Sequence, residues 1–144
     1  MKNKYYELKQ RQQKEVDNFP MMFAFSKEQF NNGMVKLGLE PTDKEKIYSI
    51  GYGGYIRKSD SKAFNELFRR HENEMKKAIE EDQTGENFIY EMFLYELNNH
   101  EYGYTYELDD TLQALNFTRE KINADERLVN GLLKATKEIK EYDN

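Results

Sequence analysis

The chain of 144 residues contains no cysteine, only two prolines and no long hydrophobic run. The absence of cysteine excludes disulfides, a thiolate nucleophile and cysteine-ligated zinc or iron–sulfur sites. No stretch approaches the roughly 18 apolar residues that span a bilayer, and residues 1–7 lack the apolar core of a signal peptide. The chain also lacks low-complexity linkers and internal repeats. We therefore expect a single cytoplasmic domain over residues 1–144, without membrane association.

Hydrophobic residues are scarce, at 38% of the chain, whereas 34% of the residues are charged. Against this, the sequence has 11 tyrosines and 9 phenylalanines. Each of these side chains buries about 150–250 Å² when it packs in a core, and a domain of this length buries roughly 68–70% of its unfolded surface. The aromatic residues therefore predict a folded protein with an aromatic core, and they argue against a disordered chain.

The hydrophobic periodicity predicts a mainly α (α+β) fold, a compact domain of about six helices with a small β-hairpin. A first helix ends before Pro20, and the apolar run at residues 21–25 is either a buried strand or the approach to the next helix. Ser26 and Gln29 have the spacing of a capping box, and Gly38 is suited to end that helix. Two β-prone segments, residues 47–50 and 55–58, flank a glycine-rich turn and predict the hairpin.

Helical patterns dominate the second half of the chain. A long helix is expected to begin at Ser59 or Asp60 and to end near Gly85, and Asn87 is expected to cap an apolar central helix. Residues 101–106 alternate in polarity, which favours a loop or an edge strand. Three further helices are expected to begin at residues 109–110, 118 and 125, the last with Leu128, Leu132, Leu133 and Ile139 on its inner face.

The charge distribution is strongly asymmetric. Residues 80–110 contain ten carboxylates and five tyrosines but no lysine or arginine, in a chain whose net charge is −5. One interpretation is that basic helices of the same protein neutralise these carboxylates by surface ion pairs. The other is an interaction surface for a protein with a basic groove, since tyrosine and carboxylate groups supply contact area and electrostatic steering. The residues expected to form this surface are Glu101, Tyr102, Tyr104, Tyr106, Glu107, Asp109 and Asp110.

The glycine-rich turn provides a second candidate site. Backbone N–H groups around Gly51, Gly53 and Gly54, together with Arg57 and Lys58, have the chemistry to bind a phosphate group. The segment is neither a Walker A loop nor a dinucleotide-binding fingerprint. A plain hairpin turn is the simpler interpretation, and a small-ligand or nucleotide site is the alternative.

The two histidines provide a third candidate site. His71 precedes Glu74 by three residues and His100 follows Glu96 by four, so each carboxylate lies beside an imidazole on one helix face. If the two helices pack antiparallel, the four side chains form a two-histidine, two-carboxylate metal cluster. The pairs do not repeat the Glu-x-x-His order of di-iron proteins. Hydrogen-bonded structural histidines are therefore the main interpretation, and no metal or cofactor is expected.

Several other functions find no support. Basic side chains in residues 57–77 are interleaved with glutamates, which cancel much of their field, so nucleic-acid binding is not expected. The sequence has no Gly-x-Ser-x-Gly elbow, no His-Glu-x-x-His motif and no EF-hand loop. An enzyme is consequently the less favoured class.

Four segments of the sequence are informative together: NFPMMFAF at residues 18–25, IYSIG at 47–51, GYIRK at 54–58 and MFLYELNNHEY at 92–102. They resemble a family of small uncharacterised proteins from Firmicutes and their phages and mobile elements. The resemblance extends over nearly the whole chain and implies no catalytic residues. It implies instead an accessory protein that binds or inhibits a host protein, including one that acts in host defence. We therefore expect a non-catalytic binding protein, and the alternative is a small-ligand, nucleotide or metal-binding protein. We also expect a homodimer, because exposed aromatic patches favour association.

Overall fold

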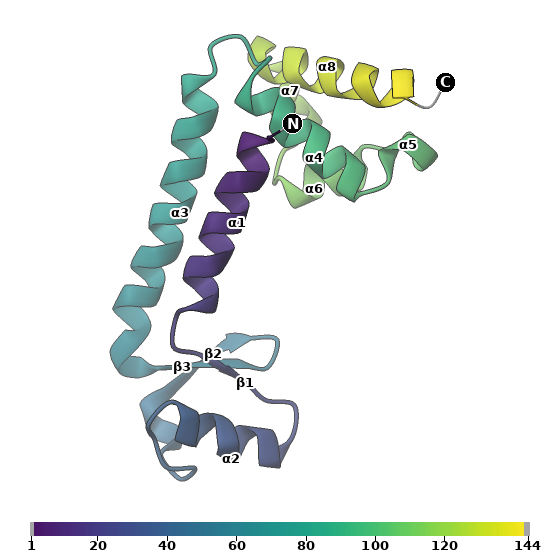
Figure 1. Cartoon of the computed structure of the whole chain (residues 1–144). Coiled ribbons are helices and arrows are strands. Elements are labelled where there is room, and N and C mark those ends of the chain that lie inside the picture. The colour runs from purple at the N-terminus through teal and green to yellow at the C-terminus, as the bar shows by residue number, and fades with distance from the viewer. Residues whose placement is uncertain (1, 143–144) are drawn as a thin grey trace. The chain divides into compact units, whose positions relative to one another are not determined.

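The computed structural model describes residues 2–142 and shows a mostly helical chain with one small antiparallel sheet (Figure 1). The elements are α1 (Lys4–Asp17), β1 (Met22–Phe23), α2 (Lys27–Lys36), η1 (Lys44–Lys46), β2 (Ile47–Gly51), β3 (Gly54–Arg57), η2 (Lys58–Asp60), α3 (Ser61–Glu81), α4 (Phe88–Asn99), α5 (Tyr102–Thr105), α6 (Asp109–Ala114), α7 (Arg119–Asn123) and α8 (Glu126–Tyr142). The predicted fold class is confirmed, with eight α-helices in this part of the chain and a third strand beside the hairpin. None of the described helices has the length and apolar character needed to cross a membrane.

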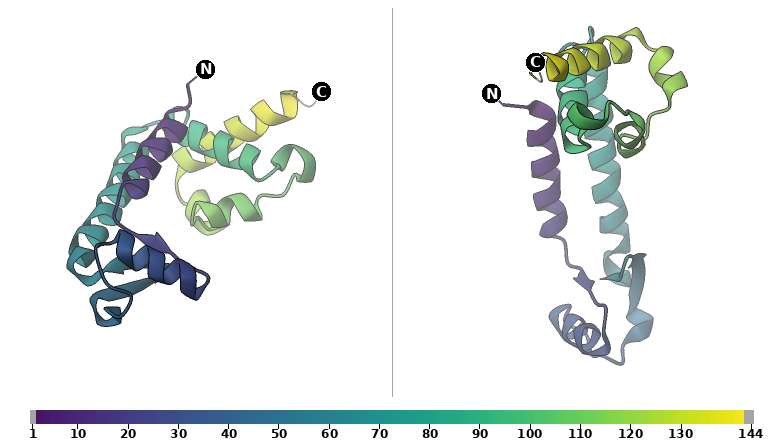
Figure 2. Two further views of the ribbon diagram at one scale, coloured as in Figure 1. Left: turned by 60° about the horizontal axis from the view of Figure 1, so that its bottom comes forward. Right: turned by 90° about the vertical axis from the view of Figure 1, so that its right-hand side faces the viewer.

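The chain divides into two compact units. Residues 13–72 form one unit, called here the sheet unit, and the residues up to 12 and from 73 onward form the other, called here the helical unit. Both units can be followed by colour in the two views of Figure 2. The expectation of a single domain over residues 1–144 stays a prediction.

In the sheet unit, α2 has the ends that the sequence predicts. The Ser26 hydroxyl accepts a hydrogen bond from the Gln29 N–H at 3.1 Å, and the Gln29 side chain accepts one from the backbone N–H of Phe25 at 2.7 Å. At the other end Gly38 has a φ of +77°, and the Leu39 N–H reaches back to the Met34 carbonyl at 2.9 Å. These are the bonds of a Schellman motif, so both ends of α2 are fixed by local sequence.

The sheet has the strand order β1-β3-β2, and both pairings are antiparallel. Its turn residues Tyr52 and Gly53 both have positive φ, as a type I′ hairpin requires. A register shift between Ser49 and Gly51 makes Ile50 a bulge in β2. The sheet packs against α2 through a small core. That core consists of the buried residues Met22, Met34 and Leu37 with Ala24, Phe30, Leu39, Ile47 and Tyr55 packed against them.

In the helical unit, α4 is the central helix that its sequence predicts. Ile89, Phe93 and Leu97 are fully buried, and α4 packs against α8. The two helices approach closely at Gly131, where an added Cβ would lie 2.6 Å from the Ile89 side chain. The expectation for α8 is wrong at Leu133, which is 61% exposed, because the inner face of this helix follows Leu128, Gly131, Ala135 and Ile139 instead.

The connection from α3 to α4 is organised by a buried carboxylate. Asp82 is 4% exposed and accepts hydrogen bonds from the backbone N–H groups of Gly85, Ile89 and Asn87 at 2.8, 2.9 and 3.0 Å. The Arg127 guanidinium donates to the Asp82 carbonyl at 2.9 Å. Asn87, the expected cap of α4, makes no capping bond with its side chain. Asp82, which precedes α4 in the sequence by several residues, therefore caps the start of this helix with its side chain.

Candidate protein-interaction surface

The acidic, tyrosine-rich segment contains a short helix, which corrects the expectation of a loop or edge strand at residues 101–106. Glu101 and Tyr106 have left-handed φ values of 59° and 55° and bound the single turn of α5. Such values are uncommon outside glycine and cost about 1–3 kcal/mol each unless the surroundings stabilise them. Here the stabilising contact is Tyr102, which is 6% exposed and packs edge-on against the Tyr106 ring with centroids 5.8 Å apart.

This arrangement separates the three tyrosines of the segment. Tyr102 is part of the core of the helical unit and adds little to the surface, contrary to the expectation that it contacts a partner. Tyr104, two residues later, is 89% exposed, and Tyr106 is 55% exposed. The buried ring therefore anchors α5 while the other two rings lie at the surface.

The carboxylates beside these rings differ in their partners. Asp109 pairs with Arg119 at 3.0 Å. Glu101, Glu107 and Asp110 are exposed, and within residues 2–142 no basic side chain lies within ion-pair distance of them. The resulting surface, called here the α5–α6 surface, comprises Glu101, Tyr104, Tyr106, Glu107, Asp109 and Asp110. Its negative charge is only partly neutralised within the chain.

A hollow of about 440 Å³ adjoins the α5–α6 surface. Its lining comes from α4, α5 and α8, and consists of Leu94, Asn98, Glu101, Gly103, Tyr104, Glu138, Ile139 and Tyr142. Tyr142 is 85% exposed, so two tyrosine rings and two carboxylates border the hollow. The contribution of α8 was not predicted, because nothing in the local sequence links residues near 104 with residues near 142.

Glu96 and His100, one half of the proposed metal cluster, lie beside each other on α4 as their spacing predicts. His100 Nε2 is 3.6 Å from a Glu96 carboxylate oxygen. Glu96 is 3% exposed, and it also accepts a hydrogen bond from the Tyr5 hydroxyl at 3.1 Å and lies 3.7 Å from Lys9 Nζ. Burial, with the Glu96 charge as a further cause, raises the pKa of Tyr5 above its ordinary value. A cation and a phenol of α1 thus compensate the buried charge of Glu96.

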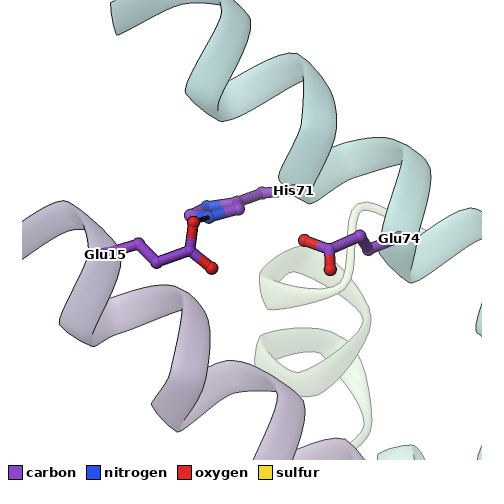
Figure 3. A group of neighbouring side chains, drawn as sticks. All are labelled: Glu15, His71 and Glu74. Carbon is purple, nitrogen blue, oxygen red and sulfur yellow. Dashed lines mark ion pairs between the residues drawn. The ribbon is translucent and has the colours of Figure 1, made fainter.

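His71 and Glu74, the other half, lie on α3 and are drawn in Figure 3 together with Glu15. His71 is buried, and its Nε2 atom lies 3.4 Å from a Glu15 carboxylate oxygen. Glu15 also pairs with Arg70, and the hydrogen bond from Arg70 holds the Glu15 pKa below its ordinary value. Glu74 pairs with Arg11 at 2.8 Å. Sequence reasoning missed Glu15, which is separated from His71 by 56 positions. The metal cluster stays an untested alternative to the predicted structural histidines.

The glycine hairpin uses its cations within the sheet unit. Arg57 donates to the Asp60 carboxylate at 2.7 Å and to the Leu37 carbonyl at 3.1 Å, which ties the hairpin to the end of α2. Lys58 Nζ lies 5.0 Å from the centre of the Tyr48 ring, a cation–π distance. Gly53 has a positive φ in the turn, and Gly51 and Gly54 face each other across the pair of strands. These contacts account for the hairpin structurally, and ligand binding there also stays a prediction.

Comparisons with known proteins place the chain in a family without assigning an activity. No curated protein and no solved structure gives a significant match. The model of a family of unknown function, DUF7659, matches residues 4–138, and the chain therefore belongs to this family.

Proposed function

We propose that the protein is a non-catalytic binding module that engages a partner protein with a basic surface through the α5–α6 surface. The observation that carries this proposal is Tyr104, which is 89% exposed on a turn anchored by the buried Tyr102. Rigid, exposed tyrosine is a common centre of protein interfaces because it contributes a large contact area at little cost in conformational entropy. Three carboxylates without ion-pair partners in the described chain lie in the same segment.

The two kinds of side chain have different roles in such an interface. Tyr104 and Tyr106 supply apolar area that is removed from water on binding, which lowers the rate of dissociation. The carboxylates attract a basic partner over a distance of about 8–10 Å, which raises the association rate in a salt-dependent manner. The proposal therefore predicts binding that weakens as the salt concentration rises.

We further propose that the protein is a cytoplasmic accessory protein of a phage or mobile element of Firmicutes. In this role it inhibits a host protein, and the candidate targets include proteins of host defence. This part rests on the resemblance of the four sequence segments. A homodimer is compatible with the proposal, because dimerisation through another face would leave the α5–α6 surface accessible.

The proposal is tested by affinity capture with tagged protein from a bacterial lysate at low and high salt, followed by binding kinetics with the purified partner. Glu101→Lys with Glu107→Lys is expected to lower the association rate by about tenfold or more, and Tyr104→Ala to weaken affinity by about 30-fold, as for an interface hot spot of 2 kcal/mol. The circular-dichroism spectrum of each variant should match that of the parent, because these side chains are exposed.

A matched control keeps the change in net charge but moves it elsewhere. Glu80→Lys with Glu120→Lys alters two exposed glutamates on α3 and α7. This variant should retain association within about twofold. Equal loss of binding in the two double variants would show that net charge alone determines binding, and it would contradict the proposal, as would full retention by the variant at residues 101 and 107.

A further inference from the structure

The sheet unit has an unpaired strand edge. In the order β1-β3-β2, the edge of β2 opposite β3 has no strand beside it within residues 2–142 (Figure 1). Natural edge strands are commonly protected by charged residues, by proline or by bulges. The five residues of β2, IYSIG, include neither a charge nor a proline. The bulge at Ile50 bends the strand near the turn, so the segment at Ile47–Ser49 offers the more regular edge.

A hollow of about 650 Å³ is lined in part by β2, the strand that carries this edge. Its lining consists of Ala24, Phe25, Ser26, Lys27, Phe30, Lys44, Ile47, Ser49 and Tyr55. Ile47 and Ser49 alternate along β2, and Ser49 pairs with Tyr55 of β3, so these three side chains share one face of the sheet. Phe30 and Tyr55 meet edge to face with ring centroids 5.5 Å apart, and the Phe25 ring is 78% exposed. The hollow thus has an aromatic lining beside an available backbone edge.

The charged side chains of the hollow are of one sign. Lys27 and Lys44 are exposed, and in the described part of the chain no carboxylate forms an ion pair with either ammonium group. A ligand with carboxylates would neutralise both groups. The electrostatics therefore favour an acidic occupant and disfavour a basic one.

We infer that β2 accepts an extended acidic peptide segment of a partner protein as a fourth strand of the sheet. Main-chain hydrogen bonds to the edge of β2 at Ile47–Ser49 would supply affinity. One apolar side chain of the peptide would contact the ring of Phe25 or Phe30, and a flanking carboxylate would pair with Lys27 or Lys44. This is the strand-addition mode of peptide recognition, in which alternate side chains enter pockets. The inference goes beyond the proposed function, because it concerns the sheet unit and an acidic rather than a basic partner.

The inference is tested with the full chain and a phage-displayed library of random linear twelve-residue peptides. The selected peptides are expected to be enriched in aspartate or glutamate beside an aromatic or aliphatic residue. Synthetic copies should bind the Lys27→Glu, Lys44→Glu variant at least about tenfold more weakly than the parent. The control Lys14→Glu, Lys62→Glu makes the same charge change at exposed lysines of α1 and α3, and it should bind within about twofold of the parent.

A second measurement separates strand addition from binding in the hollow alone. Amide hydrogen exchange, followed by NMR, should slow at those residues of 47–49 whose N–H groups point away from β3 when a selected peptide is added. The library experiment contradicts the inference if no peptide is enriched, if the enriched peptides lack acidic residues, or if both double variants bind equally. Unchanged exchange in β2 on saturation with a tight peptide would also overturn it, because the peptide would then not be a strand.

Discussion

The Asp82 carboxylate should contribute more to the free energy of unfolding than an exposed carboxylate does. Its side chain accepts hydrogen bonds from four backbone N–H groups of the α3–α4 connection, those of Thr84, Gly85, Asn87 and Ile89. Gly85 and Ile89 are buried, so in Asp82→Ala their N–H groups lose the carboxylate without access to water. A buried unsatisfied donor costs about 1–3 kcal/mol, which gives a loss of about 2–6 kcal/mol in the free energy of unfolding. Domains of this size are stable by only about 5–15 kcal/mol.

Urea denaturation at pH 7, followed by circular dichroism at 222 nm, measures this loss. The expected result is a lower midpoint with an unchanged slope, since the surface exposed on unfolding is the same. The neighbouring Glu81→Ala is the matched control, because Glu81 is exposed and pairs only loosely with Lys77 at 3.9 Å. That variant should stay within about 0.5 kcal/mol of the parent. A loss in Asp82→Ala no larger than this would refute the assignment of Asp82 as the cap of α4.

The effect of Asp82 should also depend on pH. Burial raises the pKa of Asp82, but the hydrogen bonds from the N–H groups of Ile89, Gly85 and Asn87 outweigh burial and hold the pKa below its ordinary value. The carboxylate therefore stabilises the fold fully above the unfolded pKa of about 3.9, and this contribution is lost as the pH falls through the lower folded pKa. The stability difference between the parent and Asp82→Asn should narrow below about pH 4. A difference that stays constant from pH 7 to pH 3 would contradict the charged state of Asp82.

Two further substitutions test the packing. Gly85→Ala should destabilise the protein by more than about 3 kcal/mol, because φ is +87° and the new Cβ would clash with the Arg127 carbonyl oxygen. Gly38 also has a positive φ, of +77°, but open space surrounds it. Gly38→Ala should therefore lower the free energy of unfolding by only about 1 kcal/mol, measured by thermal or urea unfolding. Equal losses would contradict the close approach at Gly85. Phe93→Ala should lower the free energy of unfolding by about 3–5 kcal/mol because the Phe93 ring is fully buried. Phe25→Ala should lower it by less than about 1 kcal/mol because that ring is 78% exposed. Similar unfolding midpoints for the two variants would contradict the placement of Phe93 in the core.

Much of the fold follows from local patterns. The ends of α2 are encoded within a few residues, by Ser26 with Gln29 and by Gly38, and the same holds for Thr118, whose hydroxyl accepts the Lys121 N–H at 3.1 Å at the start of α7. The burial of α4 follows from its apolar character. In each case the residues that determine the structure are close together in the sequence, so periodicity and capping rules were sufficient to predict it.

Features that depend on distant residues were not predictable in the same way. The segment at residues 101–106 alternates in polarity like a strand, but the packing of Tyr102 in the core holds it in a helical turn with left-handed ends. Asn87 has the right residue type for a cap, yet the Asp82 carboxylate takes that role, and Arg127 of α8 binds the Asp82 carbonyl in the same connection. The pairing of His71 with Glu15 joins two helices that are far apart in the sequence.

The count of charges at residues 80–110 predicts the α5–α6 surface but does not show which carboxylates are neutralised within the fold. Some of the ten carboxylates at residues 80–110 form hydrogen bonds or ion pairs within the fold, with backbone N–H groups, a phenol or cations. These include Asp82, Glu91, Glu96 and Asp109.

Of the others, Glu80, Glu81 and Glu86 lie around the α3–α4 connection, whereas Glu101, Glu107 and Asp110 lie in the segment that carries the exposed rings of Tyr104 and Tyr106. A binding surface needs this coincidence of apolar area and unneutralised charge, because exposed charges without contact area add little affinity. The comparison between charge reversal at residues 101 and 107 and the same reversal at residues 80 and 120 therefore tests the position of the charge, and it does so at constant net charge.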